Sequence, residues 1–561
     1  MPQSPRRRRR RNRNLKLFIY SVIIVGVVLF VSYQQNQLSG KSLSTDGLPA
    51  QAAALSDPWA DINYSLRRKL TVDSTKTVVS YTFDHAELVQ NNQSKPDGSD
   101  IQIFAQESDQ NYPVDFLLNG NDSPNASVKF DVSKHSSDTY YIYFNNKSAS
   151  PRTNVAALQG TAATAIRASE TELPAISMSP RKYWVLRYKS GAELEANLTI
   201  DKSVKDDGDQ LYYVKVGSKD LIPLNLGNTW TNPVKINLGQ IDTGDQGIYL
   251  VTQHNGNYYR SPNVYFKVSE PVFVAWTIDW EGKNVTDGVL ASISKIATTY
   301  DMPMTQFFNP RIYVDTSIPD YRRAQLTNWA KARSLINNDE IALHLHMYFD
   351  MVKAAGVTPH TTPHWGTGVD GYDVPASAYT TEEMTKVINW ALVQFAANNL
   401  PKPAGFRAGG WYANMDTLEA IDNTDLAYDS SGREDYKFGT LELAGTWKLP
   451  HTTQPYHPSI IDQNASVPGP VLKLWEMPNN GNDSYWFSSD DMISRFYANY
   501  QPGSAAANPT LVTYLSHPDW FDVDQPKLTA LFLEIDKYSF EHDRGPVVYS
   551  TLSSALQEWQ E

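Results

Sequence analysis

Two stretches of the chain end in side chains of the kinds that bind metal ions and transfer protons. The stretch 276–282 ends an apolar run in Asp279 and Glu281, and the stretch 340–346 ends in His344 and His346. Side chains two residues apart on an extended chain point the same way, so each pair can share one face. Two carboxylates and two imidazoles form a ligand set for Zn²⁺ or a similar divalent ion, with room for a water. Taken singly, each pair also fits a helix cap or solvated histidines.

The elements that must position these side chains begin after residue 270, where strand-like runs alternate with helical ones. The predicted strands are 272–278, 304–308, 340–345, 404–407, 425–428, 511–515 and 546–549, and the predicted helices are 285–300, 321–337, 381–398 and 415–423. Alternation of this kind predicts parallel βαβ units, and this number of units predicts a deformed (β/α) barrel over residues 270–561. Sites in such folds lie at the carboxyl ends of the strands, where both pairs are expected.

The composition of the chain excludes some kinds of metal ligand and argues against some kinds of partner. The 561 residues predict several domains, and the absence of cysteine excludes thiolate ligands and disulfides, so any metal must be held by His, Asp or Glu. The formal net charge is −12 although the first sixteen residues are strongly basic, so the rest of the chain is more acidic still. An acidic protein of this kind argues against nucleic acid as a partner.

The first residues have the composition of a membrane-targeting segment. Residues 1–16 are rich in Arg and are predicted to stay in the cytoplasm, and residues 17–33 are apolar and free of formal charge, close to the shortest span of a bilayer core. We therefore predict a single-pass signal anchor in the cell membrane, with the bulk of the chain extracytoplasmic. Residues 34–56 are predicted to be a spacer, in which Ala52-Ala53-Ala54 leaves cleavage open.

Two all-β modules are predicted between the spacer and the barrel. Residues 57–150 alternate as short strands typical of a β-sandwich and resemble a jelly-roll-like module of bacterial surface proteins, most clearly at 64–71, 81–85 and 140–144. Residues 151–180, rich in Ala, Ser, Thr and Pro, are predicted to be a linker. Residues 181–269 are predicted to form an immunoglobulin-like sandwich, because 245–249 resembles its tyrosine corner. The sequence leaves open whether these modules bind carbohydrate.

Taken in order, the motifs after residue 270 resemble those of the polysaccharide deacetylase family, which shares the NodB homology domain of the family 4 carbohydrate esterases. The stretch 277–282 resembles the Thr-Phe-Asp-Asp-Gly motif, with Trp280 at the place of the second Asp, as in a divergent Asp-x-Glu branch. The stretch 340–344 resembles the lead-in to the first histidine of the second motif, but Tyr348 stands four residues later where the family has a second histidine. The stretches 405–411, 427–431 and 511–518 resemble the third, fourth and fifth motifs.

The resemblance implies a role for each matching residue. Asp279 is expected to be the general base, Arg407 to orient it and Asp429 to support the site. His517 is expected to be the general acid. Glu281, His344 and Asp279 are expected at the metal, with His346 or, in reserve, His364 as the third ligand. The expected metal is zinc, with cobalt or nickel as alternatives. Trp365, Trp411 and Trp520 are expected to stack on sugar rings, as is Trp486, and Asp429 is expected near the substrate.

The implied activity is metal-dependent removal of N-acetyl groups, that is, hydrolysis of non-peptide carbon–nitrogen bonds, from an extracellular or cell-wall polysaccharide such as peptidoglycan. Two alternatives stay open. The altered metal motif also fits a catalytically inactive surface protein that binds glycan, and the same site fits hydrolysis of a non-sugar amide. The glycan, the metal and the oligomeric state are not determined by the sequence.

Overall fold

A computed structural model describes residues 43–44, 60, 64, 66–73, 75–91, 93–107, 110–146, 149, 158, 163–164, 166–167, 176–200, 209–226, 230–254 and 257–560. The predicted basic segment 1–16 and signal anchor 17–33 lie outside these residues, as do nearly all of the spacer 34–56 and most of the linker 151–180. Within the described ranges, none of the helices combines the length and the apolar character that a membrane span requires.

The chain divides into two compact units. One consists of residues 1–181, 194–236 and 246–266, and the other of residues 182–193, 237–245 and 267–561. The site predicted from the sequence lies wholly in the second unit.

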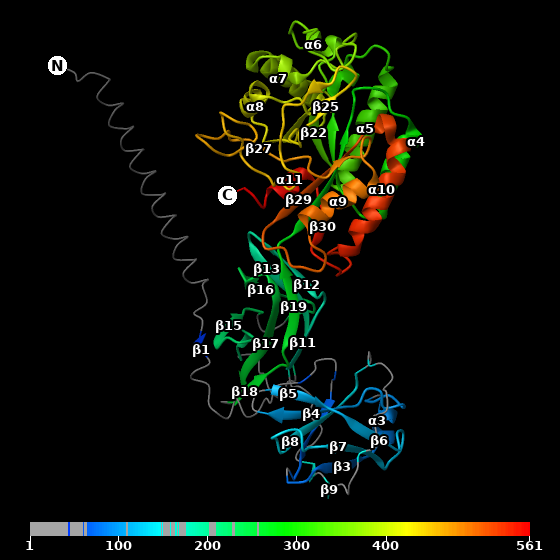
Figure 1. The fold of residues 1–561 in the computed structure, drawn as a ribbon, viewed down its shortest axis with the longest axis vertical. Helices are drawn as coiled ribbons and strands as arrows, with labels where there is room; N and C mark the ends of the chain where they lie inside the picture. Colours follow the sequence, from blue (N-terminus) through cyan, green and yellow to red (C-terminus); the bar gives the residue numbers. More distant parts are fainter. Residues whose placement is uncertain are drawn as a thin grey trace, which may run out of the picture. The chain divides into compact units, whose positions relative to one another are not determined.

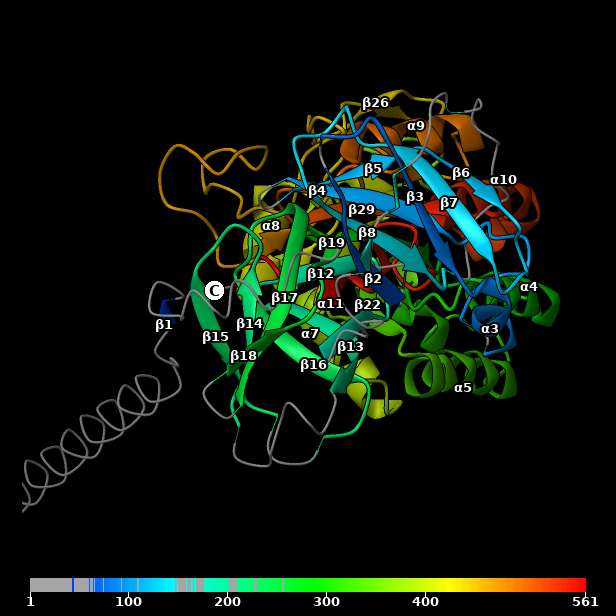
Figure 2. The same ribbon diagram turned by 90° about the horizontal axis from the view of Figure 1, so that it is seen from below.

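The first unit begins with a pair of β-sheets (Figures 1 and 2). One sheet has the order β10-β2-β8-β4-β5 and the other the order β6-β7-β3-β9. Their strands are β2 (Leu66–Thr71), β3 (Val78–Phe83), β4 (Gln102–Glu107), β5 (Gln110–Val114), β6 (Phe116–Asn119), β7 (Ala126–Asp131), β8 (Thr139–Phe144), β9 (Ala163–Thr164) and β10 (Ile166–Arg167). Leu70 and Ile142 of the first sheet share one apolar core with Val128 and Phe130 of the second. The two sheets therefore form a sandwich, as the alternating pattern predicts.

The second β-rich stretch is divided between the two units. Its strands are β11 (Ile176–Pro180), β12 (Trp184–Tyr188), β13 (Gly191–Ile200), β14 (Leu211–Lys215), β15 (Asp220–Leu224), β16 (Val234–Gly239), β17 (Gly244–His254), β18 (Asn257–Arg260) and β19 (Val264–Ser269). Inside the first unit β14 pairs antiparallel with both β15 and β17. The predicted all-β character of this stretch is confirmed, and its assignment to the immunoglobulin-like class stays a prediction.

The second unit is built on a parallel sheet with the order β27-β24-β23-β22-β21-β20-β29-β28, and β30 also pairs with β20. The strands are β20 (Val272–Asp279), β21 (Met304–Phe308), β22 (Glu340–Leu345), β23 (Gly405–Ala408), β24 (Tyr428–Asp429), β27 (Trp475–Glu476), β28 (Asn482–Asp483), β29 (Thr510–Ser516) and β30 (Val547–Tyr549). No pairing joins β27 to β28 within the described part of the chain, so the sheet fits an open, deformed (β/α) barrel. All eight residues of β20 are buried, as expected for a strand covered on both faces.

Helices alternate with these strands (Figure 1). They are α4 (Asp287–Thr299), α5 (Asp320–Asn337), α6 (Phe349–Ala354), α7 (Thr381–Ala397), α8 (Met415–Asp422), α9 (Ser489–Asn499), α10 (Phe521–Ile535) and α11 (Leu552–Leu556). The predicted start of α7 is confirmed, because Thr380 and Glu383 cap each other's backbone N–H groups in a capping box. The helices α9 and α10 were not predicted, and Pro526 interrupts the helical pattern of α10.

Candidate active site

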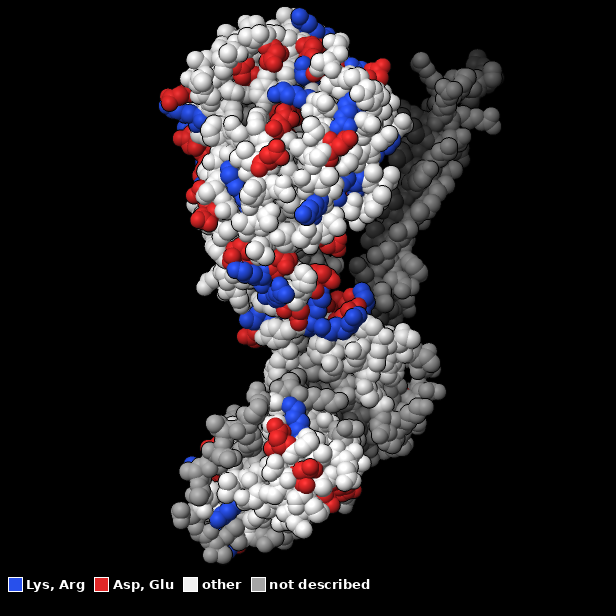
Figure 3. Space-filling view, turned by 90° about the vertical axis from the view of Figure 1, so that its right-hand side faces the viewer, with Lys and Arg blue, Asp and Glu red and all other residues white. Residues whose placement is uncertain are grey.

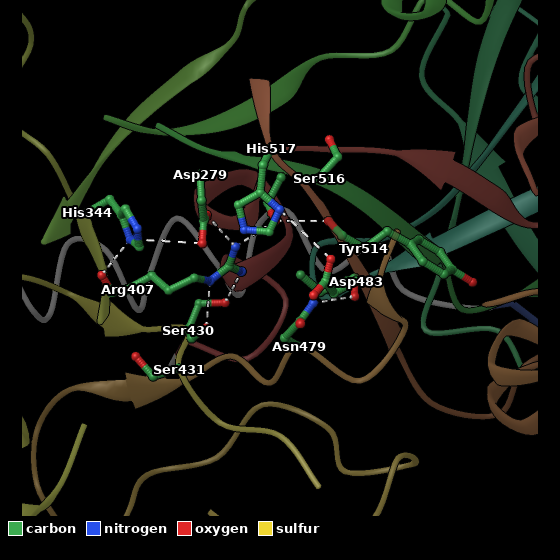
Figure 4. A network of polar contacts seen from close by, with 12 residues as sticks. Asp279, His344, Arg407, Ser430, Ser431, Asn479, Asp483, Tyr514, Ser516 and His517 are labelled. Atoms are coloured by element: carbon green, nitrogen blue, oxygen red, sulfur yellow. Dashed lines mark hydrogen bonds and ion pairs between the residues drawn. The ribbon is translucent and has the colours of Figure 1, made fainter. Parts of the chain in front are cut away.

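The carboxyl ends of β20, β22 and β29 bring the predicted chemical groups into one cavity of about 170 Å³. β20 pairs in parallel with β21 and β29, and β21 pairs in parallel with β22, so their carboxyl ends meet at one edge of the sheet. The cavity is lined by Asp279, Glu281, His344, His346, Tyr372, Gly410, Trp411, Phe438, Asp483, Tyr485, Trp486, His517 and Trp520. Figure 4 shows part of the polar network around it.

Glu281, His344 and His346 form a group of buried ligands. One ligand atom from each lies within 4.8 Å of the others. The Nε2 atom of His346 is 2.8 Å from Oε2 of Glu281, and Nε2 of His344 is 3.9 Å from Oε1 of the same carboxylate. A carboxylate and two imidazoles are three ligands of the kind found in catalytic zinc sites, which leave a further position for water or substrate.

The backbone orients both imidazole rings toward the carboxylate. The Nδ1 atom of His344 lies 3.0 Å from the carbonyl oxygen of Arg407, and Nδ1 of His346 lies 2.9 Å from the carbonyl oxygen of Tyr372. A carbonyl can only accept, so each Nδ1 carries the proton and each Nε2 keeps its lone pair. The Nε2 atom of His344 is buried without a hydrogen-bond partner in the described structure, which is the state expected of a ligand facing a cation site.

The residues around Glu281 explain two departures from the family motifs. Trp280 points into the core, with its ring centroid 5.4 Å from that of Phe308, so its neighbours Asp279 and Glu281 both face the cavity. Tyr348, at the place of the family's second histidine, donates a hydrogen bond of 3.1 Å to the carbonyl oxygen of Glu281. Gly282 has φ +69°, and a Cβ there would lie 2.9 Å from that of Arg311. The chain can therefore turn here only with glycine.

The charges of this group suit a divalent cation. Burial lowers the pKa of His344 to about 4 despite the nearby Asp279 carboxylate, so the imidazole is neutral at pH 7. Burial by itself would raise the pKa of Glu281, but the imidazoles of His346, His344 and His517 bring it below its usual value. A neutral imidazole at His344 and an ionised carboxylate at Glu281 are protonation states that metal binding requires. The described residues therefore fit the predicted metal.

A buried arginine, Arg407, orients the Asp279 carboxylate. Asp279 lies near Nδ1 of His344, whereas Glu281 lies near Nε2 of the same ring. The Arg407 guanidinium donates to Oδ1 of Asp279 at 2.9 Å and to Oγ1 of Thr277 at 2.7 Å. It also donates to the carbonyl and the hydroxyl of Ser430, both at 2.8 Å, and lies 4.1 Å from the ring centre of Phe307. The orientation of Asp279 is thus set by a side chain whose own position is fixed by three further partners.

His517 faces Glu281 from the end of β29 and has a carboxylate behind it. Its Nε2 lies 3.7 Å from Oε1 of Glu281, and its Nδ1 lies 3.9 Å from Oδ1 of Asp483. Burial would lower the pKa of His517, but Asp483, Glu281 and Asp279 together raise it above its usual value. The imidazole is therefore suited to carry a proton that it can donate. Asp483 was not predicted, because the two-residue strand β28 has no periodicity; only its Asn-Asp ending could have drawn attention to it.

Besides Arg407, three residues singled out in the sequence lie outside the cavity lining. His364 lies in the segment between α6 and α7, where its Nδ1 is 2.6 Å from the carbonyl oxygen of Gly366. The structure thus places His346, and not His364, with Glu281 and His344. Trp365 is buried by stacking on Tyr412, with ring centroids 5.3 Å apart. Asp429 is buried behind the site, where it accepts hydrogen bonds from Ser431.

The cavity wall is largely aromatic. Trp411, Trp486 and Trp520, which are expected to stack on sugar rings, line it together with Phe438 and Tyr485, which were not assigned to the site from the sequence. The rings are in contact from Trp520 through Tyr485 and Trp486 to Phe438, with centroids 4.8, 5.1 and 5.7 Å apart. Trp486 is 58% exposed, so an apolar ring face is open to a ligand at the mouth of the cavity.

Comparisons with known proteins give matches among solved structures. No protein-family model matches the chain, and no curated protein matches it. A candidate polysaccharide deacetylase from Mycobacterium smegmatis matches with 13% identity over 51% of this chain and 89% of its own, at a TM-score of 0.32. A family 4 carbohydrate esterase from Streptomyces lividans in complex with acetate matches with 11% identity over 48% and 88%, at 0.26. A CE4 family pseudoenzyme from Bacillus anthracis matches with 13% identity over 51% and 66%, at 0.26.

These structures come from the family that the motifs of this chain resemble. Identities and TM-scores this low do not by themselves assign an activity. The side chains of the cavity therefore have to carry any proposal about function.

Proposed function

We propose that the protein is a metal-dependent hydrolase that removes acetyl groups from an N-acetylated polysaccharide. The observation that supports this best is the meeting of three groups in one cavity. These are the buried Glu281, His344 and His346 cluster, the Asp279 carboxylate held by Arg407, and the His517 imidazole backed by Asp483. A ligand set, a base and an acid in one cavity are the parts that hydrolysis of an amide needs.

Each side chain has a role in this proposal. Glu281, His344 and His346 would hold the divalent metal, which when bound would polarise the acetyl carbonyl and make water more acidic. Asp279, oriented by Arg407, accepts the proton of the attacking water. His517 as its imidazolium donates a proton to the departing sugar amine, and the Asp483 carboxylate stabilises that charge. The aromatic wall holds the sugar ring.

The glycan class follows from the charges of the cavity. Asp279, Glu281 and Asp483 line it, whereas none of the lining residues is Lys or Arg. On the face of the molecule shown in Figure 3, acidic and basic side chains of the second unit are interspersed, without a large basic patch. A neutral polymer rich in N-acetylhexosamine, such as a cell-wall glycan, suits such a site better than a polyanion. With the predicted signal anchor, the proposal places this activity outside the cell membrane.

The proposal is tested by metal analysis of the purified full-length protein together with acetate release from N-acetylglucosamine oligomers. His344→Ala is compared with the wild type, and His364→Ala is the matched control, because it removes a nearby histidine that lies outside the cavity lining. About one metal ion per chain is expected in the wild type and in the control. Loss of both metal and acetate release is expected in His344→Ala.

Other outcomes separate the alternatives. Metal without acetate release from any glycan tested would favour hydrolysis of a non-sugar amide, which a screen of acetylated amides would follow. A wild type that binds no metal would contradict the enzyme and favour a surface protein that binds glycan. If His364→Ala lost the metal while His344→Ala kept it, the assignment of the ligands would be wrong.

A further inference from the structure

Tyr372 contacts the metal ligands although it belongs to none of the sequence motifs. It lies in the segment between α6 and α7, downstream of the histidine strand, and lines the cavity. No periodicity or motif marks this segment in the sequence. The contacts of Tyr372 are therefore information that only the tertiary structure provides.

Two contacts tie Tyr372 to His346. Its carbonyl oxygen accepts the hydrogen bond from Nδ1 of His346 at 2.9 Å. Its ring stacks on the imidazole of His346, with centroids 4.0 Å apart and the planes 9° from parallel. The hydrogen bond fixes the tautomer, and the stacked ring prevents the imidazole from turning about its bond to the chain.

The hydroxyl of Tyr372 lies near Glu281. Burial and the nearby Glu281 carboxylate raise the pKa of the Tyr372 phenol well above its usual value, so the hydroxyl keeps its proton. A protonated hydroxyl can donate to a carboxylate. One residue thus contacts His346 through its ring and carbonyl and brings its hydroxyl near Glu281.

The segment that carries Tyr372 is itself fixed on the residues that follow β22. The backbone N–H of Phe349 donates to the carbonyl of Asp370 at 2.9 Å, and that of Tyr372 donates to the Asp370 carboxylate at 3.0 Å. Gly371 has φ +84°, and a Cβ there would lie 2.7 Å from the carbonyl oxygen of Met347. The segment therefore approaches Met347 more closely than any other residue type would allow at position 371. These contacts hold the segment of Tyr372 against the residues that follow His346.

We propose that Tyr372 is a positioning residue of the metal site, which fixes His346 through its ring and carbonyl and presents its hydroxyl to Glu281. This inference rests on the proposed function. Partners of this kind commonly contribute a factor of about 10 to 100 in metal affinity. Tyr372→Ala removes the ring and the hydroxyl, so its Kd for metal is expected to rise by about 10- to 100-fold. Tyr372→Phe keeps the ring and the carbonyl, and a rise of up to about 10-fold is expected.

The experiment measures the Kd of Zn²⁺ and Co²⁺ for full-length protein by competition with a chelating dye. The matched control is Tyr379→Phe, because Tyr379 is buried in the same segment and accepts a hydrogen bond from the backbone N–H of His360, away from the ligands. Thermal unfolding of each metal-free variant shows whether it is folded. The visible absorption of bound Co²⁺ reports its coordination, and this spectrum is expected to change in the Tyr372 variants and to stay unchanged in Tyr379→Phe.

The outcomes keep this proposal separate from the proposed function. A folded Tyr372→Ala variant that binds metal as tightly as the wild type overturns the positioning role. An unchanged affinity in Tyr372→Phe overturns the contribution of the hydroxyl. Tight metal binding by the wild type without acetate release contradicts the deacetylase activity and leaves the comparison of Tyr372 variants intact. A wild type without metal affinity contradicts the metal site itself, and with it both proposals.

Discussion

Replacing Arg407 with methionine is expected to leave the Asp279 carboxylate without its cation in the interior of the protein. Arg407 is fully buried and Asp279 is 3% exposed, so water cannot take the place of the guanidinium. Methionine roughly preserves the apolar length of the side chain, whereas the hydrogen bonds to Asp279, Thr277 and Ser430 are lost.

The magnitude follows from these contacts. Removing one partner of a buried ion pair costs about 3–5 kcal/mol, because the remaining charge is desolvated and unpaired. Much of this cost is the penalty on Asp279, so the substitution Asp279→Asn added to Arg407→Met is expected to recover about 0.5–3 kcal/mol relative to the sum of the single changes. Acetate release is expected to fall in both single variants, since the base is removed in one and misplaced in the other.

The assay is urea unfolding of the single and double variants, followed by acetate release at a temperature where each is folded. Arg333→Met is the matched control, because Arg333 is also buried and forms two hydrogen bonds with Asp339, at 2.8 and 2.9 Å, outside the cavity lining. It is expected to lose comparable stability while the folded protein keeps its kcat. An Arg407→Met variant destabilised by less than about 1 kcal/mol, or additive effects in the double variant, would refute the reasoning.

Three further predictions address other groups. Asp483→Asn removes a carboxylate that raises the pKa of His517, so the basic limb of the kcat–pH profile is expected to move to lower pH; an unmoved limb would count against His517 as the acid. Asp429 and Glu476 are buried together, and burial raises the pKa of both carboxyl groups, so the folded state holds extra protons and this stability is lost as pH rises above the usual carboxyl range. The free energy of unfolding of the wild type relative to Asp429→Asn, measured in urea, is expected to fall as pH rises, and a constant difference would contradict it. Trp486→Ala is expected to raise KM for oligomers by about 10-fold, equivalent to about 1.4 kcal/mol, with little change in kcat; equal losses for monomer and oligomer would argue against stacking at the mouth.

Much of the catalytic fold could be predicted because its strands are long and buried. The runs at β20, β22 and β29 are largely apolar, and these strands and β21 were each located to within about a residue or two of the structure. The two-residue strands β27 and β28 were not predicted, since a strand of that length has no measurable period. Their positions come from pairing with β24 and β29, which is a property of the assembled sheet.

The sequence by itself determined that Asp279 with Glu281, and His344 with His346, share faces at strand ends, because alternation along an extended chain needs no tertiary information. It could not choose between His346 and His364, since a histidine in a loop has no periodic position. Only the tertiary structure turned His364 toward its own backbone and placed Asp483 behind His517. It also buried Asp429 behind the site and brought Tyr372 onto His346. The physical reason is that such contacts depend on how loops and short strands pack against the sheet, and residue spacing does not encode that packing.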